Sequence, residues 1–162
     1  MITIKKVEKE DIAKVKELLL ETWIDTYGAI MSEDTISKIT SIWHDPARLE
    51  AQANDEKIIF QAAIDNFGEM IGLITIGKND GDTADLLRLY IHPDKQRQGI
   101  GNILLEQALK ELKEYKRVRL EVEEANQKGK SFYYKFGFKE VEKKVENIEG
   151  EKFNTIIMEK SI

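Results

Sequence analysis

The chain has 162 residues, 41% of them hydrophobic, which predicts one domain spanning residues 1–162. Because it contains no cysteine, disulfides, thiolate metal sites and a cysteinyl acyl intermediate are excluded. A net charge of −5 argues against general nucleic-acid binding, and no apolar stretch approaches the roughly 20 residues of a membrane-spanning helix. The N-terminus lacks the pattern of a signal peptide, so we expect a cytoplasmic protein.

The N-terminal third of the chain predicts one strand and three helices. Residues 2–7 alternate as in a strand, and residues 11–27 carry a helical apolar stripe that ends at Gly28. Ser32 has the position of an N-cap for a second helix, and Pro46 opens a short third helix.

From residue 57 onward the hydrophobic period changes to that of strands. Residues 57–64 and 70–76 are β-branched runs on either side of a turn at residues 65–68, which predicts an antiparallel hairpin. After a second turn, residues 84–91 are expected to form the central strand. The remaining elements follow in the order helix 101–115, with Ile103, Leu104, Ala108 and Leu112 on one apolar face, strand 118–122, helix 126–136, and strands 138–145 and 154–158.

The segment from Tyr90 to Gly101 joins the central strand to an amphipathic helix through a turn that carries Gln96 and Gly99. A helix start leaves backbone N–H groups without partners and carries the positive end of the helix dipole. A pyrophosphate can therefore bind there if no side chain blocks its approach, and the glycines at 99 and 101 remove that block. The N–H donors are expected from Arg97 to Asn102.

Two motifs resemble those of the GNAT superfamily of N-acetyltransferases. Residues 96–101 (Gln-Arg-Gln-Gly-Ile-Gly) resemble its acetyl-coenzyme A cradle, and residues 126–138, with Phe-Tyr-x-Lys-x-Gly-Phe at their end, resemble its second signature. The resemblance implies an α/β (α+β) fold with a mixed, mostly antiparallel sheet of six to seven strands. That sheet would be splayed at its central strands and flanked by helices. Residues 86–93, 131–135 and 21–27 further resemble the spermine/spermidine N-acetyltransferase branch of bacteria and archaea.

The resemblance implies acetyl-CoA as the cosubstrate. Leu89 and Ile91 would lend backbone groups to its pantetheine arm, and the Ile91 N–H would also face the thioester carbonyl oxygen. Asn126 would hydrogen-bond the pantetheine or thioester region, and it can equally serve as the N-cap of the helix that it opens. The full set of implied contacts is Leu89, Tyr90, Ile91, Gln96, Arg97, Gln98, Gly99, Ile100, Gly101, Asn102, Asn126, Tyr133 and Lys135.

Two catalytic side chains follow from the same resemblance. Tyr133 matches the family tyrosine that protonates the departing thiolate, because a phenol with a pKa of about 10 keeps its proton at neutral pH. Asp85 matches the position where many members carry a glutamate, which would help to deprotonate the attacking amine. Glu123 and Glu124 are alternatives for that base.

The acceptor is expected to bind at the N-terminal helices as a small-molecule amine. Trp23, Tyr27, Glu21 and Asp25 would shape an acidic, aromatic pocket suited to a polyamine. A protein N-terminus, a peptide or another small amine are alternative acceptors, and a noncatalytic acetyl-CoA-binding regulatory domain is an alternative of another class. No metal site is expected, because His44 and His92 are isolated. The protein would be a monomer or a homodimer.

Overall fold

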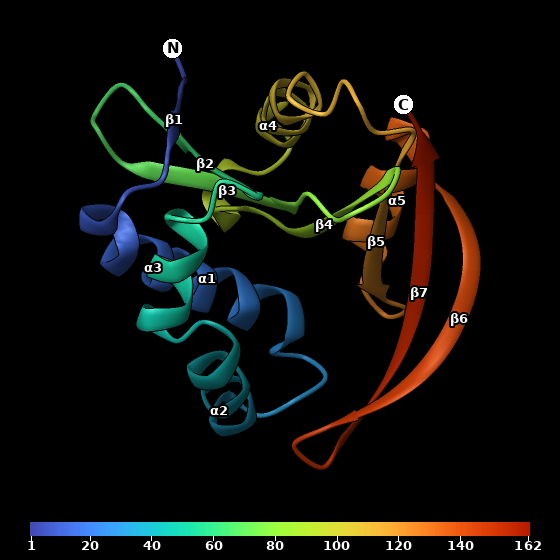
Figure 1. The fold of residues 1–162 in the computed structure, drawn as a ribbon. Helices are drawn as coiled ribbons and strands as arrows, with labels where there is room; N and C mark the ends of the chain where they lie inside the picture. Colours follow the sequence, from blue (N-terminus) through green and yellow to red (C-terminus); the bar gives the residue numbers. More distant parts are fainter.

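The computed structural model describes residues 1–162 as seven strands and five α-helices (Figure 1). In chain order these are β1 (Thr3–Lys6), α1 (Ile12–Tyr27), α2 (Glu33–Trp43), α3 (Pro46–Ala53), β2 (Ile58–Ile64), β3 (Met70–Gly77), β4 (Thr83–Ile91), α4 (Ile100–Leu109), β5 (Arg117–Glu123), α5 (Gln127–Phe136), β6 (Lys139–Ile148) and β7 (Glu151–Ser161). Short 3₁₀ turns lie at Lys9–Asp11 (η1) and Pro93–Lys95 (η2). None of the helices combines the length and apolar character needed to cross a membrane.

All seven strands belong to one sheet, in the order β1-β2-β3-β4-β5-β7-β6. Every neighbouring pair is antiparallel except β4 and β5, which are parallel. Helices α1 and α3 pack on one face of the sheet, and α4 packs on the other (Figure 1). The expected mixed, mostly antiparallel sheet flanked by helices is confirmed.

Helices α2 and α3 begin where Ser32 and Pro46 predicted, and the structure adds Asp45 as the cap of α3. The Ser32 hydroxyl accepts a hydrogen bond from the Thr35 N–H at 3.1 Å at the start of α2. At the start of α3, the Asp45 carboxylate accepts from the Ala47 N–H, with Pro46 at the first helical position. These side chains satisfy backbone donors that a helix start otherwise leaves unpaired.

The predicted helix over residues 101–115 is wrong at its C-terminal end, because α4 stops at Leu109. The Leu112 N–H bonds to the Leu109 carbonyl three residues back, so the chain tightens into turns there. Leu112 still reaches the core, with 2% of its surface exposed. The buried face also differs from the expected one, since Ile103 is exposed and Leu105 is buried.

The sheet opens between its two parallel strands. β4 pairs with β5 only from Thr83 to Leu86, opposite residues 117–120, although both strands continue beyond that point. On its other side β4 stays paired with β3 as far as Ile91. One edge of β4, from Leu87 to Ile91, is therefore left without a strand partner, which confirms the expected splay.

Candidate active site

The turn at residues 96–102 lies where the sheet opens. Gly99 precedes α4 in the left-handed region, with φ +80°, and no side chain caps this helix. None of the backbone N–H groups from Gln96 to Asn102 donates to an acceptor within the chain. Together with the helix dipole, these donors fit the pyrophosphate of coenzyme A.

The two glycines of the turn serve different purposes. A Cβ atom built on Gly99 would meet nothing within 4 Å, so this position leaves the approach to the turn open. A Cβ on Gly101 would lie 3.1 Å from the Phe132 ring. Gly101 therefore lets α5 pack against α4, and the expectation that its missing side chain clears the way for pyrophosphate is corrected. Its N–H group remains a predicted donor.

Replacing Gly99 by valine is expected to weaken coenzyme A binding at least about tenfold, because a β-branched residue resists a positive φ and its side chain would fill the open approach. Calorimetric titration with coenzyme A measures this directly. Gly68, in the turn between β2 and β3, is a matched control with φ +79° and no neighbour within 4 Å of its Cβ position. Gly68→Val should carry the same backbone strain without the loss of affinity. Unchanged affinity in Gly99→Val would count against the turn as the binding site.

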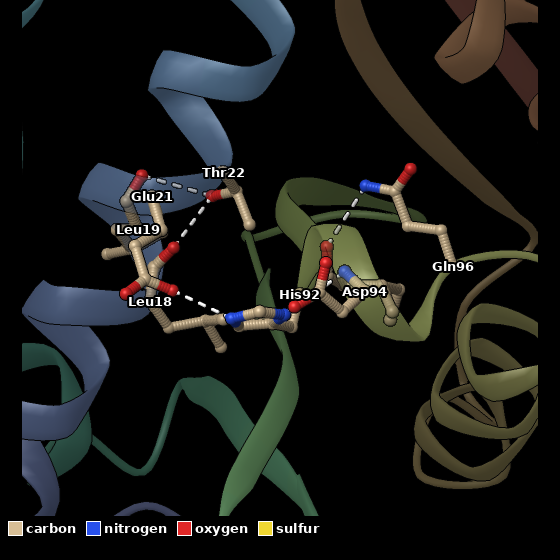
Figure 2. A network of polar contacts seen from close by, with 8 residues as sticks. Leu18, Leu19, Glu21, Thr22, His92, Asp94 and Gln96 are labelled. Carbon is tan, nitrogen blue, oxygen red and sulfur yellow. Dashed lines mark hydrogen bonds and ion pairs between the residues drawn. The ribbon is translucent and has the colours of Figure 1, made fainter.

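The unpaired edge of β4 presents the backbone groups of Leu89 and Ile91. The His92 N–H donates to the Ile71 carbonyl on β3, so by the alternation of an antiparallel ladder Leu89 and Ile91 point the other way. The Gln96 side-chain amide donates to the Ile91 carbonyl at 3.1 Å and holds the turn against the end of β4 (Figure 2). The edge thus offers hydrogen-bonding groups for an extended, amide-containing ligand.

Three tyrosines from different elements meet at this opening, together with Glu123 and Asn126. Tyr27 comes from α1, Tyr90 from β4 and Tyr133 from α5. Burial raises the pKa of Tyr27 well above its usual value, Tyr90, Glu123 and Tyr133 raise it further, and Asn126 partly offsets the rise. Tyr27 and Tyr90 contact the same hydrophobic cluster, and the Asn126 N–H donates to the Glu123 carbonyl at 2.9 Å, so these residues come from neighbouring parts of the opening.

Tyr133 is the inward-facing member of the tyrosine pair on α5. Its ring packs edge-on against Phe132 and Phe138, with centroids 5.4 and 5.6 Å away. Burial raises its pKa, and Tyr90 adds to the rise. Tyr134, by contrast, is exposed and donates to the Glu140 carboxylate on β6. Tyr133 thus holds its proton firmly inside the cluster.

Asn126 is the N-cap of α5, because its side-chain oxygen accepts from the Gly129 N–H at 2.9 Å. Asn126 also offsets part of the rise in the pKa of Tyr27. A Cβ on Gly129 would lie 2.7 Å from the Asn126 amide nitrogen, so a side chain there would displace this amide. The capping alternative is confirmed, while the expected contact with acetyl-CoA stays a prediction.

The structure separates the three candidate carboxylates. Asp85 accepts from the Asn79 side-chain amide at 2.6 Å and lies where β4 and β5 are still paired, about 20 Å along the strand from Ile91. Glu124 is paired with Lys143 at 3.4 Å. Glu123 lies at the end of β5, where that strand has parted from β4, and of the three it alone raises the pKa of Tyr27. The fold therefore does not bring Asp85 together with Tyr133.

The environment of Glu123 is unusual for a carboxylate. Burial raises its pKa, Glu124 adds to the rise, and the backbone amides of Ala125 and Asn154 partly offset it. Its Oε2 atom is buried and has no hydrogen-bond partner in the chain. A buried polar atom without a partner is costly, so this oxygen is suited to receive a donor from a bound molecule.

The four expected acceptor residues divide into two groups. Trp23 and Tyr27 are buried and pack together, with ring centroids 4.6 Å apart, and both are near Tyr90. Glu21 is instead paired with the His92 imidazole at 2.9 Å, and Asp25 is exposed. The acceptor pocket therefore stays a prediction: Trp23 and Tyr27 lie together in the core, while Glu21 is turned to the β4–α4 segment.

The sequence did not predict that the last two strands pack against Trp23 and Tyr27. Phe153 on β7 is buried against Trp23 and Tyr27, and Ile148 on β6 packs beside it. Lys38 on α2 pairs with Glu149 in the turn between these strands, at 3.2 Å. The β6–β7 hairpin curves around to α2 (Figure 1). No local motif marks this contact, since it joins segments more than 100 residues apart.

The sheet is splayed beside an uncapped helix start, and the partly buried phenol of Tyr133 comes from the helix that packs against that start. Residues 13–138 match the family model described as the acetyltransferase (GNAT) family. The chain belongs to that family and is an acetyl-CoA-dependent N-acetyltransferase.

The chain is 35% identical to a spermidine N(1)-acetyltransferase of Thermoplasma acidophilum, over 98% of this chain and 96% of that protein. The crystal structure of the PaiA N-acetyltransferase from Thermoplasma acidophilum in complex with coenzyme A has a TM-score of 0.85 and 33% identity, covering 100% of this chain and 99% of that one. The ribosomal-protein-S18-alanine N-acetyltransferase of Escherichia coli shares the fold, with a TM-score of 0.71 and 24% identity over 100% and 94% of the two chains.

Proposed function

We propose that this acetyltransferase transfers the acetyl group of acetyl-CoA to a primary amine of a polyamine such as spermidine or spermine. Transfer would be direct, within a ternary complex, since no cysteine is present to carry an acyl group. The likeness to a spermidine N(1)-acetyltransferase over almost the whole chain supports this acceptor class. The observation that carries the catalytic part is the buried, unpartnered Oε2 atom of Glu123 at the end of β5 where the sheet opens.

The cosubstrate would lie across the opening of the sheet. The N–H groups from Arg97 to Asn102 would bind its pyrophosphate, and the backbone N–H and carbonyl of Leu89 would pair with its pantetheine amides, which leaves the Ile91 N–H free to face the thioester. Arg97 and Lys135 are exposed and able to add positive charge. When bound there, acetyl-CoA supplies an activated thioester carbonyl.

Glu123 is our choice of base in place of Asp85. An amine with a pKa of about 10 arrives mostly as an ammonium ion, which would pair with the Glu123 carboxylate. The carboxylate would then take a proton from the nitrogen, directly or through water, which frees the lone pair for attack on the thioester carbon. The raised pKa of Glu123 makes it a stronger base than an ordinary surface carboxylate.

Tyr133 would complete the transfer. As the C–N bond forms, negative charge grows on the carbonyl oxygen, where the Ile91 N–H is a candidate donor. The C–S bond then breaks with its electron pair on sulfur, and the Tyr133 hydroxyl would give its proton to that sulfur. Burial keeps the Tyr133 proton in place until a thiolate is present to receive it.

The aromatic side chains would select for a cation near the thioester. Trp23 and Tyr27 pack together with 4% and 8% of their surface exposed, and an acceptor that reaches these rings would be attracted to their faces as an ammonium ion. A neutral or anionic acceptor would gain nothing from this arrangement.

Incubating the protein with acetyl-CoA and a panel of amines tests the proposed function. We expect acetylated spermidine or spermine with equimolar release of free coenzyme A, detected by mass spectrometry and a thiol reagent. Acetylation of a peptide N-terminus while both polyamines are ignored would refute the polyamine acceptor. Coenzyme A binding without turnover of any amine would instead indicate a regulatory domain.

A further inference from the structure

We propose that Glu21 and His92 form a latch that positions the coenzyme A turn from helix α1, so that Glu21 acts on cosubstrate affinity rather than on acceptor recognition. This inference rests on the proposed function only in taking the turn at residues 96–102 as the binding site for coenzyme A. It assigns a role to His92. It also assigns Glu21 to the coenzyme A turn instead of the acceptor pocket that the sequence predicted.

Both ring nitrogens of His92 are engaged. Nδ1 accepts a hydrogen bond from the Asp94 N–H at 3.1 Å, which caps η2. Since Nδ1 is an acceptor, the neutral ring carries its proton on Nε2. Nε2 lies 2.9 Å from the Glu21 carboxylate and donates to it (Figure 2). The imidazole thus bridges α1 and the segment that leads into the turn.

His92 lies directly between the β4 edge and the turn. It follows Ile91, whose carbonyl accepts from the Gln96 side chain at 3.1 Å, so the two ends of this short segment are tied together. The η2 turn that His92 caps lies inside the loop closed by that bond. Any shift of the imidazole would therefore move the first residues of the coenzyme A turn.

The α1 end of the latch is held as firmly as the other. Thr22, next to Glu21, is buried, and its hydroxyl shares its one proton between the carbonyls of Leu18 and Leu19 (Figure 2). Trp23, the following residue, is buried against Tyr27 and Phe153. Among the ion pairs of the structure, the Glu21–His92 pair alone connects α1 with the β4–α4 segment.

The pair is too exposed to matter much for folding. The side chains of His92 and Glu21 keep 30% and 45% of their surface accessible, and exposed pairs add little stability. The position of the coenzyme A turn is more sensitive than stability, because the donors of a binding site must be held within a fraction of an ångström. Loss of the latch should therefore appear in cosubstrate affinity and leave the melting temperature almost unchanged.

The test compares three substitutions at two positions by calorimetric titration with coenzyme A and by steady-state kinetics. Glu21→Ala removes the acceptor of the Nε2–H group, and we expect the Kd for coenzyme A to rise about fivefold to tenfold. Glu21→Gln keeps an oxygen that accepts this hydrogen bond, so its Kd should stay within about twofold of the parent value. His92→Asn keeps an oxygen able to cap Asp94 but is too short to reach Glu21, and it should match Glu21→Ala.

The double variant Glu21→Ala, His92→Asn should be no weaker than either single variant, because both remove the same contact. Glu17→Ala, one turn earlier on α1 and likewise exposed, is the control and should bind coenzyme A normally. Unchanged affinity in Glu21→Ala, additive losses in the double variant, or an equal loss in Glu17→Ala would overturn the latch. A rise confined to the KM of the amine would return Glu21 to the acceptor pocket. Because coenzyme A binding needs no acceptor, these results do not depend on which amine is acetylated.

Discussion

Replacing Tyr133 by phenylalanine is expected to lower kcat about 100-fold while acetyl-CoA affinity stays nearly the same. The substitution removes one hydroxyl and keeps the ring that packs against Phe132 and Phe138. Without that proton, the sulfur must leave as a thiolate or take a proton from water, and 100-fold corresponds to about 2.7 kcal/mol of barrier. Single-turnover kinetics measures the effect on the chemical step.

The neighbouring residue supplies the control for this substitution. Tyr134→Phe removes a hydroxyl of the same kind on the same helix, but that hydroxyl bonds to Glu140 at the surface. We expect its kcat to remain within about twofold of the parent value, as is usual for exposed positions. Equal turnover in Tyr133→Phe and the parent would remove Tyr133 from the mechanism.

Local chemistry explains why the sequence located the coenzyme A turn. A strand, a glycine-containing turn and a helix follow one another directly, so the free N–H groups come from consecutive residues. The role of Gly101 in helix packing could not be predicted in the same way. It depends on Phe132, which approaches from a helix that is remote in sequence.

The sequence alone could not decide which carboxylate lies at the opening of the sheet. Asp85 and Glu123 lie at opposite ends of two adjacent parallel strands, and only the end where the strands part is open. A motif gives the position of a residue in the chain, whereas the point at which β4 and β5 separate is a property of the sheet. Glu21 is a similar case, because its side chain reaches across to His92 instead of joining the residues of the same helix in the pocket.

Glu123→Gln is expected to lower kcat/KM at neutral pH by about 100-fold, because an amide cannot take the proton of the amine. In the parent enzyme kcat/KM should fall as the pH drops through the pKa of Glu123, which burial holds above its ordinary value. In Glu123→Gln that acidic limb of the profile should disappear. Glu124→Gln, next to it and paired with Lys143 at the surface, should keep the limb.

Glu123→Gln should also change protein stability, which gives a second and independent test of the role of Glu123. Because the folded-state pKa of Glu123 lies above the unfolded one, its contribution to stability is fully present below the unfolded pKa and is lost as the pH rises through the folded pKa. Glutamine does not ionise and avoids this loss. The melting temperature of Glu123→Gln relative to the parent should therefore increase from acidic to neutral pH. A variant that is less active and yet more stable at neutral pH would identify a partly buried charge kept for catalysis, whereas a less stable one would indicate a structural role.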